Sequence, residues 1–132
     1  MMISTRGRYA LRVLVDLAEH RNGGYIPMKD VSQRQEISLK YLEKIMPVLT
    51  QNGLVEGVHG KGGGYKLCKP ASEIPVGEIL RLTERELAPV SCLSENATEC
   101  HKAGECKTIK FWKGLNDTIN GYIDHVMLSE LL

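Results

Sequence analysis

The chain has 132 residues, 42% of them hydrophobic, and a formal net charge of +1. This size and composition predict one domain of ordinary size with its own core, and they exclude a disordered chain. No stretch has the apolar centre of a signal peptide or the length of a membrane span, so we expect a cytoplasmic protein that contacts no membrane.

The charge is unevenly distributed along the chain. Residues 1–70 hold 11 Lys and Arg against 6 Asp and Glu, a balance of +5, whereas residues 71–132 hold 6 against 10, a balance of −4. A basic first half favours an anionic partner, nucleic acid above all. Chance unevenness on solvated faces would give the same count.

Apolar residues at helical spacing predict a first helix over residues 5–19, with Thr5 as its N-cap. The stretch "HRNGG" ends this helix in a turn. A short helix is expected over residues 28–35, and a tight connector then leads to Ser38. Ser38 is a good N-cap for the next helix, over residues 39–52.

Pro47 lies inside the helix expected over residues 39–52, where it removes one backbone hydrogen bond and predicts a bend. Two strand-like runs follow, over residues 54–59 and 65–69, and the connection "GKGGG" between them is typical of a hairpin tip. A further short helix is expected over residues 74–84.

The last element is expected to be a long helix from about residue 108 to residue 128. Its apolar residues are spaced by 3, 4, 3 and 4, which is a two-heptad seam; they are Trp112, Leu115, Ile119, Tyr122 and Val126. Such a seam either packs on the helix's own domain or joins two copies of the chain, and we predict a homodimer.

The order of the elements defines the fold class: mainly α with a small β-hairpin, as in a winged helix-turn-helix domain followed by a long dimerisation helix. In this fold the second helix of the helix-turn-helix enters the major groove of double-stranded DNA. The exposed positions at its start are Ser38, Lys40, Glu43 and Lys44. On the wing, His59, Lys61 and Lys66 flank glycines that let the backbone approach phosphate. Each lysine taken singly is better explained as a solvated surface charge, and it is the order of these features in the chain that predicts DNA binding.

Three cysteines, Cys92, Cys100 and Cys106, lie within fifteen residues of a polar stretch. Thiolates are the usual ligands of iron–sulfur clusters. The spacing alone leaves zinc, a thiol redox switch and thiols without function open, although a zinc site would usually contain a C-x2-C pair.

Several stretches together resemble the Rrf-type family of bacterial winged-helix transcription regulators, the IscR, NsrR and CymR group. They are "STRGRYALRVLVDLA", "ISLKYLEKIMPVLTQNGLVEGVHGKGGGYKL" and "VGEIL", and the similarity covers nearly the whole chain. It implies a homodimer on a pseudo-palindromic operator, divided into a DNA-binding domain (1–84), a cysteine loop (85–107) and a dimerisation region (108–132). It places Ser38, Lys40, Tyr41 and Glu43 on the recognition helix, and His59, Lys61 and Gly62 on the wing.

The resemblance also implies that the three cysteines hold an iron–sulfur cluster, of 2Fe-2S or 4Fe-4S type, that senses iron, nitric oxide or redox state. CymR-type members lack these cysteines. The fourth ligand stays open, since Ile109 and Arg8 occupy the positions where IscR and NsrR-like members carry theirs. Glu95, Glu99, Glu105 or a small ligand from solution are the alternatives. His59 departs from the arginine that is common at its wing position.

A different class, an electron-transfer protein or small enzyme with a cluster cofactor, would leave the recognition helix and the wing unexplained. The sequence contains no nucleophile–base pair or catalytic carboxylate pair, and "GKGGGY" lacks the P-loop pattern. We therefore expect neither enzymatic activity nor a small-molecule substrate.

Overall fold

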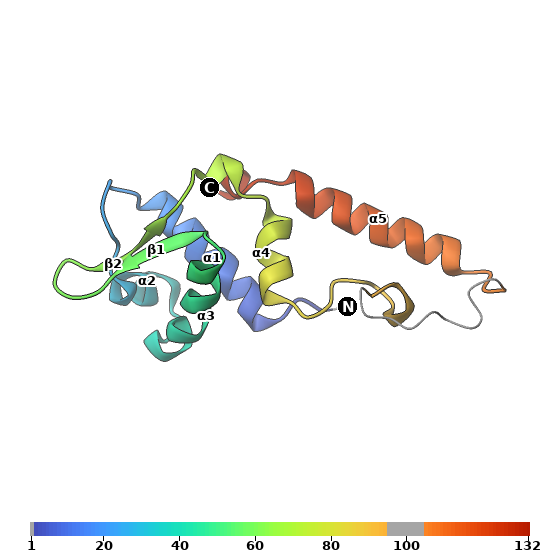
Figure 1. Ribbon diagram of the computed structural model, residues 1–132, viewed down its shortest axis with the longest axis horizontal. Coiled ribbons are helices and arrows are strands. Elements are labelled where there is room, and N and C mark those ends of the chain that lie inside the picture. Colours follow the sequence, from blue (N-terminus) through green and yellow to red (C-terminus); the bar gives the residue numbers. More distant parts are fainter. Residues whose placement is uncertain (1, 95–104) are drawn as a thin grey trace.

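A computed structural model describes residues 2–94 and 105–132 of the chain (Figure 1). The α-helices and strands, in chain order, are α1 (Thr5–Glu19), α2 (Met28–Gln35), α3 (Leu39–Gln51), β1 (Val55–Val58), β2 (Gly64–Leu67), α4 (Val76–Thr83) and α5 (Ile109–His125). Three short 3-10 helices are η1 (Ala71–Glu73), η2 (Ser91–Leu93) and η3 (Leu128–Leu131). The expected class, mainly helical with one small hairpin, is confirmed. Within the described residues every helix is too short or too polar to cross a bilayer.

The core forms around α1, against which α2, α4, the hairpin and η3 pack (Figure 1). Apolar residues of α1 and α3 that recur every three or four positions face inward and are fully or almost fully buried: Val13, Leu14, Leu17, Leu42, Ile45 and Leu49. This stripe is the reason that the two segments are helical and lie on one core. The remaining faces of both helices stay in solvent.

Side-chain caps set where the first and third helices begin. Ser38 caps α3 as expected, because its Oγ accepts a hydrogen bond of 3.1 Å from the backbone N–H of Tyr41. The cap of α1 is Ser4 rather than Thr5: Ser4 is extended and accepts from the N–H of Gly7, whereas Thr5 is already helical. Helix α3 continues through Pro47 without interruption.

The hairpin is a two-stranded antiparallel sheet in which Val55 pairs with Leu67 and Val58 with Gly64. Ile26, from the loop between α1 and α2, extends this sheet by one rung through reciprocal backbone hydrogen bonds with Tyr65 of 2.8 and 2.9 Å. Gly64 has φ +151°, and a Cβ at this position would lie 2.1 Å from the carbonyl oxygen of Ile26. Only glycine therefore allows the wing to dock against this loop.

The long C-terminal helix ends earlier than expected. The chain leaves the helix after His125 and returns to the winged-helix domain, where Val76 donates to the carbonyl of Val126 and Leu128 donates to that of Ile74, both at 2.8 Å. Leu128 is fully buried in the main core. Burial of Leu128 and these two hydrogen bonds favour docking of residues 126–128 over their continuation of the helix.

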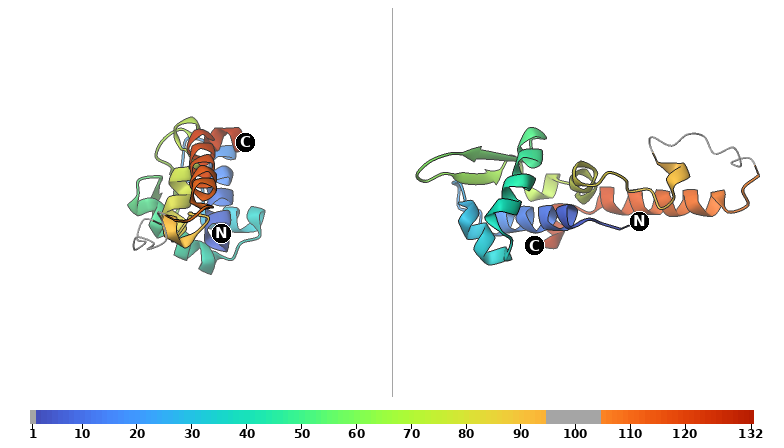
Figure 2. Two further views of the ribbon diagram at one scale, coloured as in Figure 1. Left: turned by 90° about the vertical axis from the view of Figure 1, so that its right-hand side faces the viewer. Right: turned by 90° about the horizontal axis from the view of Figure 1, so that it is seen from below.

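The face of α5 that packs on its own chain differs from the expected seam. Ile123 is buried against α4, and Arg81 of α4 binds Asp124 and the amide oxygen of Asn120. Asn120 and Asp124, which are not part of the expected apolar seam, therefore contact α4. On the other faces of this helix, which runs outward from the winged-helix domain, Phe111 and Tyr122 are 64% and 71% exposed (Figures 1 and 2).

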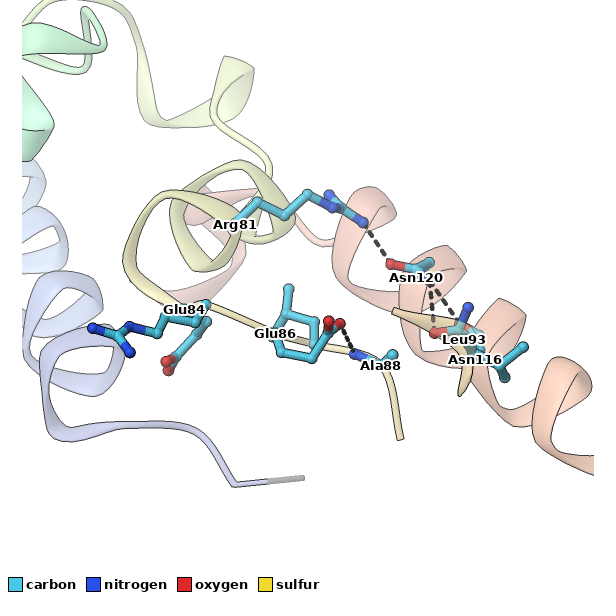
Figure 3. A pocket seen from close by; sticks show the side chains of 9 residues that line it. Arg81, Glu84, Glu86, Ala88, Leu93, Asn116 and Asn120 are labelled. Atoms are coloured by element: carbon cyan, nitrogen blue, oxygen red, sulfur yellow. Dashed lines mark hydrogen bonds between the residues drawn. The ribbon is translucent and has the colours of Figure 1, made fainter. Parts of the chain in front are cut away.

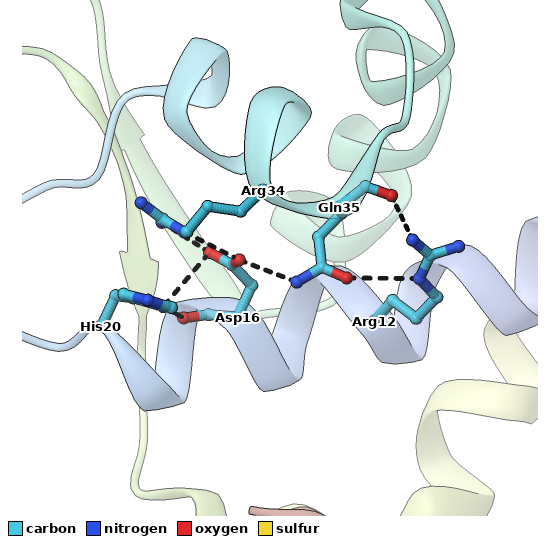
Figure 4. Close-up of polar contacts among 5 residues, drawn as sticks. All are labelled: Arg12, Asp16, His20, Arg34 and Gln35. Carbon is cyan, nitrogen blue, oxygen red and sulfur yellow. Dashed lines mark hydrogen bonds and ion pairs between the residues drawn. The ribbon is translucent and has the colours of Figure 1, made fainter.

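A buried carboxylate joins α1 to α2. Asp16 is fully buried and accepts two hydrogen bonds from Arg34, at 2.7 and 3.0 Å, and one of 2.9 Å from Gln35 (Figure 4). Arg12 donates to both the side chain and the backbone of Gln35. Burial by itself would raise the pKa of Asp16, but the bonds from Arg34 and Gln35 outweigh it and hold the pKa below its ordinary value.

We expect Asp16→Ala to lower the free energy of unfolding by about 3 kcal/mol, because Arg34 and Gln35 lose their common partner. Urea denaturation near neutral pH measures this change. Glu19→Ala, which removes an exposed carboxylate from the same helix, is the matched control and should change the value by less than about 0.5 kcal/mol.

The difference in unfolding free energy between the wild type and Asp16→Ala should depend on pH. Because the pKa of Asp16 is lower in the folded chain than in the unfolded one, its stabilisation is complete above the unfolded pKa of about 3.9. The stabilisation is lost as the pH falls through the folded-state pKa. The difference between wild type and Asp16→Ala should therefore narrow below about pH 4. A difference that widens on acidification would contradict this assignment.

Candidate DNA-binding surface and cysteine segment

The start of α3 presents a polar surface to solvent. Ser38, Lys40, Glu43 and Lys44 are all exposed, whereas Leu42 and Ile45 face the core and are buried. This division follows from helical periodicity, since the apolar stripe of α3 fixes the rotation of the helix on the core. The side chains of α3 that were predicted to contact bases or phosphates therefore lie exposed at the start of the helix. Tyr41 is the exception, because it is half-buried.

Tyr41 is half-buried and packs on α1. Its ring meets that of Tyr9 edge-on, with centroids 5.4 Å apart, and the guanidinium of Arg12 lies 5.2 Å from the centroid of Tyr9. An edge-to-face pair of this kind stabilises by about 1 kcal/mol beyond the area that it buries. Tyr41 thus connects the recognition helix to α1 at the point where the exposed residues begin.

The connector between α2 and α3 sets the angle of the recognition helix. Glu36 ends α2 in the left-handed conformation, with φ +55° and ψ +42°, which non-glycine residues adopt at a cost. Ser32 Oγ donates to the carbonyl of Ile37 at 2.5 Å. These contacts and the hydrogen bonds of Asp16 with α2 hold the turn from within the chain.

The wing tip is built from residues 59–63. Gly60 and Gly62 have φ values of +92° and +79°, and Gly63 donates to the carbonyl of Gly60 at 3.0 Å. His59 and Lys61 are exposed at this tip. The glycines therefore allow a tight turn that places one imidazole and one ammonium group at the end of the hairpin.

Lys66, which flanks the wing glycines in the sequence, forms an ion pair within the hairpin. Its Nζ lies 3.2 Å from a carboxylate oxygen of Glu56 on the paired strand and 4.8 Å from the ring centroid of Tyr25. The hydrogen bond with Glu56 raises the pKa of Lys66, so the lysine remains charged but neutralised. Of the lysines predicted to contact DNA, Lys40, Lys44 and Lys61 remain exposed.

The structure describes two of the three clustered cysteines, one on each side of residues 95–104. Cys92 is exposed on η2, and Cys106 is partly exposed just before α5. Cys100 lies outside the described residues, as do Glu95 and Glu99; Glu105 is exposed. Within the described parts of the chain, no three potential metal ligands gather. The predicted ligand set is therefore untested by geometry.

The thiol of Cys106 has a distinct environment. Its Sγ lies 3.4 Å from Oγ1 of Thr108, and hydrogen bonding to the side chain and then the backbone of Thr108 lowers the pKa of the thiol. A thiol with a lowered pKa supplies more thiolate, which is the form that binds metal and reacts with oxidants. The donor chemistry of Cys92 and Cys106, two free accessible thiols, fits an iron–sulfur or zinc group. Thr108 was not predicted as part of this site, although its position two residues after a cysteine was visible.

The fourth cysteine, Cys68, lies apart from the three clustered cysteines. It lies just beyond β2 with its side chain exposed, because Leu67 takes the inward position and the backbone N–H of Cys68 donates to Leu54 at 3.0 Å. Desolvation and the charge of Glu56 raise its pKa. Cys68 is a poorer thiolate than Cys106 and serves as an internal comparison.

A helix-turn-helix with a capped, solvent-exposed second helix and a glycine-tipped wing defines a winged-helix protein of the DNA-binding class. The Rrf2 family of iron-dependent transcriptional regulators matches residues 3–132. The chain belongs to the Rrf2 family of transcription regulators, which are DNA-binding proteins and not enzymes.

The relatives support the same assignment. The chain is 38% identical to the HTH-type transcriptional regulator IscR of Serratia proteamaculans, over all of this chain and 79% of that protein. It is 37% identical to IscR of Escherichia coli, of which it covers 80%. Among solved structures, the global cysteine regulator CymR of B. subtilis has a TM-score of 0.79 at 30% identity, covering 99% of this chain and 95% of that one. The IscR of T. potens has a TM-score of 0.77 at 30% identity, covering 99% and 85%.

We expect Thr108→Val to raise the pKa of Cys106 towards that of an ordinary thiol, because valine has the same shape but offers no hydrogen bond. The rate of alkylation by iodoacetamide, followed against pH in a chain whose other cysteines are serine, should show its inflection at higher pH. Thr118→Val, the same substitution further along α5, should leave the profile unchanged. An inflection that stays in place in Thr108→Val would refute the assigned cause.

Proposed function

We propose that the chain is a homodimeric regulator whose binding to operator DNA is controlled by an iron–sulfur cluster on Cys92, Cys100 and Cys106. The proposed division is a DNA-binding domain over residues 1–84, a cysteine segment over residues 85–107 and a dimerisation region over residues 108–132. The observation that carries the DNA-binding part is the exposed, capped start of α3 beside a glycine-tipped wing.

Two kinds of DNA contact follow from the surface of the recognition helix and wing. Lys40 and Lys44 can bind phosphates or a guanine edge, and Glu43 can accept from a cytosine amine. Ser38 and Tyr41 lie beside them, with Tyr41 mainly holding α3 in place. At the wing, His59, Lys61 and Gly62 would contact phosphate or enter the minor groove, where the neutral imidazole attracts less strongly than arginine would.

The proposed dimer is supported by the unequal faces of α5. The helix contacts its own chain through Ile123, Asn120 and Asp124, and leaves Phe111 and Tyr122 mostly exposed. Large aromatic side chains at these exposures are typical of a surface that a second protein covers. A twofold dimer would also place two recognition helices on a pseudo-palindromic operator.

The cluster proposal rests on the donor set and on the similarity to IscR proteins. Cys92 and Cys106 are free and accessible, and the lowered pKa of Cys106 favours the thiolate. With Cys100 they would hold a cluster, whose fourth ligand is open among Glu105, the two other glutamates of the segment and a small ligand from solution. A bound cluster would supply a group that responds to iron, nitric oxide or oxidants.

A direct thiol redox switch is the second candidate. The observation that favours it is the lowered pKa of Cys106, since thiolate character makes a cysteine susceptible to oxidation. An oxidized form of Staphylococcus aureus CymR, 33% identical to this chain with a TM-score of 0.77, covers 99% of this chain and 95% of that one. Colour distinguishes the two functions, because a cluster absorbs visible light and a disulfide does not.

The DNA-binding surface is tested with Lys40→Ala and Lys61→Ala. Binding is measured at several salt concentrations, on DNA that the wild type enriches from a random pool. A lysine that contacts phosphate should, when removed, weaken binding and lower the slope of log affinity against log salt by about 1. Lys113→Ala on α5 has the same change in charge and should leave both unchanged. Equal losses in all three variants would mean that net charge alone decides affinity.

The cluster is tested by the visible spectrum and by the iron and acid-labile sulfide content of anaerobically purified protein. A brown wild type with matched iron and sulfide is expected, together with colourless Cys92→Ala and Cys106→Ala. Cys68→Ala should keep its colour, because this thiol lies on the wing strand. A wild type that stays colourless after reconstitution with iron and sulfide would exclude the cluster and leave zinc or a thiol switch.

A further inference from the structure

Residues 84–88 lead from the end of α4 towards Cys92 and lie between two different parts of the molecule. On one side they border a hollow that is also lined by Leu93 and by Asn116 and Asn120 of α5 (Figure 3). On the other side they approach the start of α1. The stretch is ordered by its own contacts, since Glu86 accepts from the backbone N–H of Ala88 at 2.8 Å.

Glu84 is the residue of this stretch that binds the winged-helix domain. Its Oε1 accepts a hydrogen bond of 2.6 Å from the backbone N–H of Ser4, the residue that caps α1. The carboxylate therefore occupies the positive end of the α1 dipole, where a negative charge is stabilising. Helix α1 has no acidic residue of its own in its first turn, so a residue eighty positions away supplies the charge.

Gly7 is matched to this carboxylate. It is buried, and a Cβ added to it would lie 2.5 Å from Oε1 of Glu84 and 3.1 Å from Oγ1 of Thr83. The absence of a side chain therefore lets the end of α4 reach the cap of α1. The approach of the two helices therefore depends on Glu84 at the end of α4 and on Gly7 in α1. A substitution at either residue disturbs it.

The contact lies next to the recognition helix. Tyr41 lines a hollow of about 470 Å³ together with Ser4, Glu84 and Arg85, among others. Through its ring Tyr41 also meets Tyr9, one turn further along α1 from Ser4. Residues 84–86 thus share a hollow with the side chain of Tyr41, and Glu84 also binds the start of the helix on which Tyr41 packs.

Resting on the function proposed above, we propose that Glu84 is a positioning residue that couples the state of the cysteine segment to the recognition helix. Cys92 follows Glu84 by eight residues. Leu87, between them, packs against the apolar cluster that contains Ile123 of α5, and Glu84 binds Ser4 of the domain that carries α3. A change at the cysteines displaces this stretch and alters the bond from Ser4 to Glu84. The Tyr9–Tyr41 contact then transmits the altered position of α1 to α3.

The proposal is tested by comparing the DNA affinities of cluster-loaded and cluster-free protein. We expect the two forms of the wild type to differ at least about five-fold, and those of Glu84→Ala to differ less than about two-fold. Glu84→Gln should retain most of the difference, because its amide oxygen still accepts from Ser4. Glu86→Ala is the matched control and should respond like the wild type, because Glu86 bonds to Ala88 of its own stretch and not to Ser4.

Two further measurements separate coupling from a general structural defect. The visible spectrum of Glu84→Ala should equal that of the wild type, and hydrogen exchange of residues 4–9 should respond to cluster loading only in the wild type. Gly7→Ala displaces the same carboxylate, so it should also abolish the difference in DNA affinity between the cluster-loaded and cluster-free forms. This second variant tests the coupling even if Glu84→Ala does not fold.

The outcomes distinguish the two proposals. A wild type whose affinity is equal with and without the cluster overturns the proposed regulation, and the coupling with it. A responsive wild type beside an equally responsive Glu84→Ala or Gly7→Ala overturns the coupling alone. Loss of response in both variants, with a normal spectrum and a responsive Glu86→Ala, supports it.

Discussion

The buried carboxylate of Asp16 is the interaction on which the placement of the DNA-binding surface depends. A charge without water is costly unless several donors surround it, and here Arg34 and Gln35 both reach back from α2. Because α2 is held in this way, the left-handed Glu36 and the cap at Ser38 start α3 at one defined angle. The apolar stripe of α3 then decides which residues remain outside.

The same principle, a polar group held between distant segments, recurs where the winged-helix domain meets the rest of the chain. Arg81 joins α4 to α5 through Asp124 and Asn120, and Glu84 joins the end of α4 to the start of α1. Both contacts are partly accessible to water, so each is weaker than the Asp16 cluster and easier to rearrange. The function proposed here needs such a division, with a rigid DNA-binding domain and a more adaptable connection to the proposed sensing segment.

Local sequence signals predicted most of the fold. Helical spacing, Ser38 as a cap and the glycine-rich tip located α1 to α3 and the hairpin within a few residues, because each signal acts between neighbours in the chain. The errors fell where distant contacts compete with local preference. Ser4 replaced Thr5 as the cap, and Val126 and Leu128 left the helix to bind Ile74 and its neighbours. Lys66 left the predicted wing surface because Glu56 faces it across the sheet.

The sequence by itself determined the winged-helix class, the residues at the start of the recognition helix and the grouping of thiols around residues 92–106. These follow from periodicity, caps and residue chemistry, which need no knowledge of the partner segments. Only the tertiary structure decided which side chains neutralise each other, which face of α5 is left open, and that Glu84 reaches Ser4. These depend on contacts between residues 10 to 80 positions apart in the chain, and no local pattern encodes a contact across such a separation.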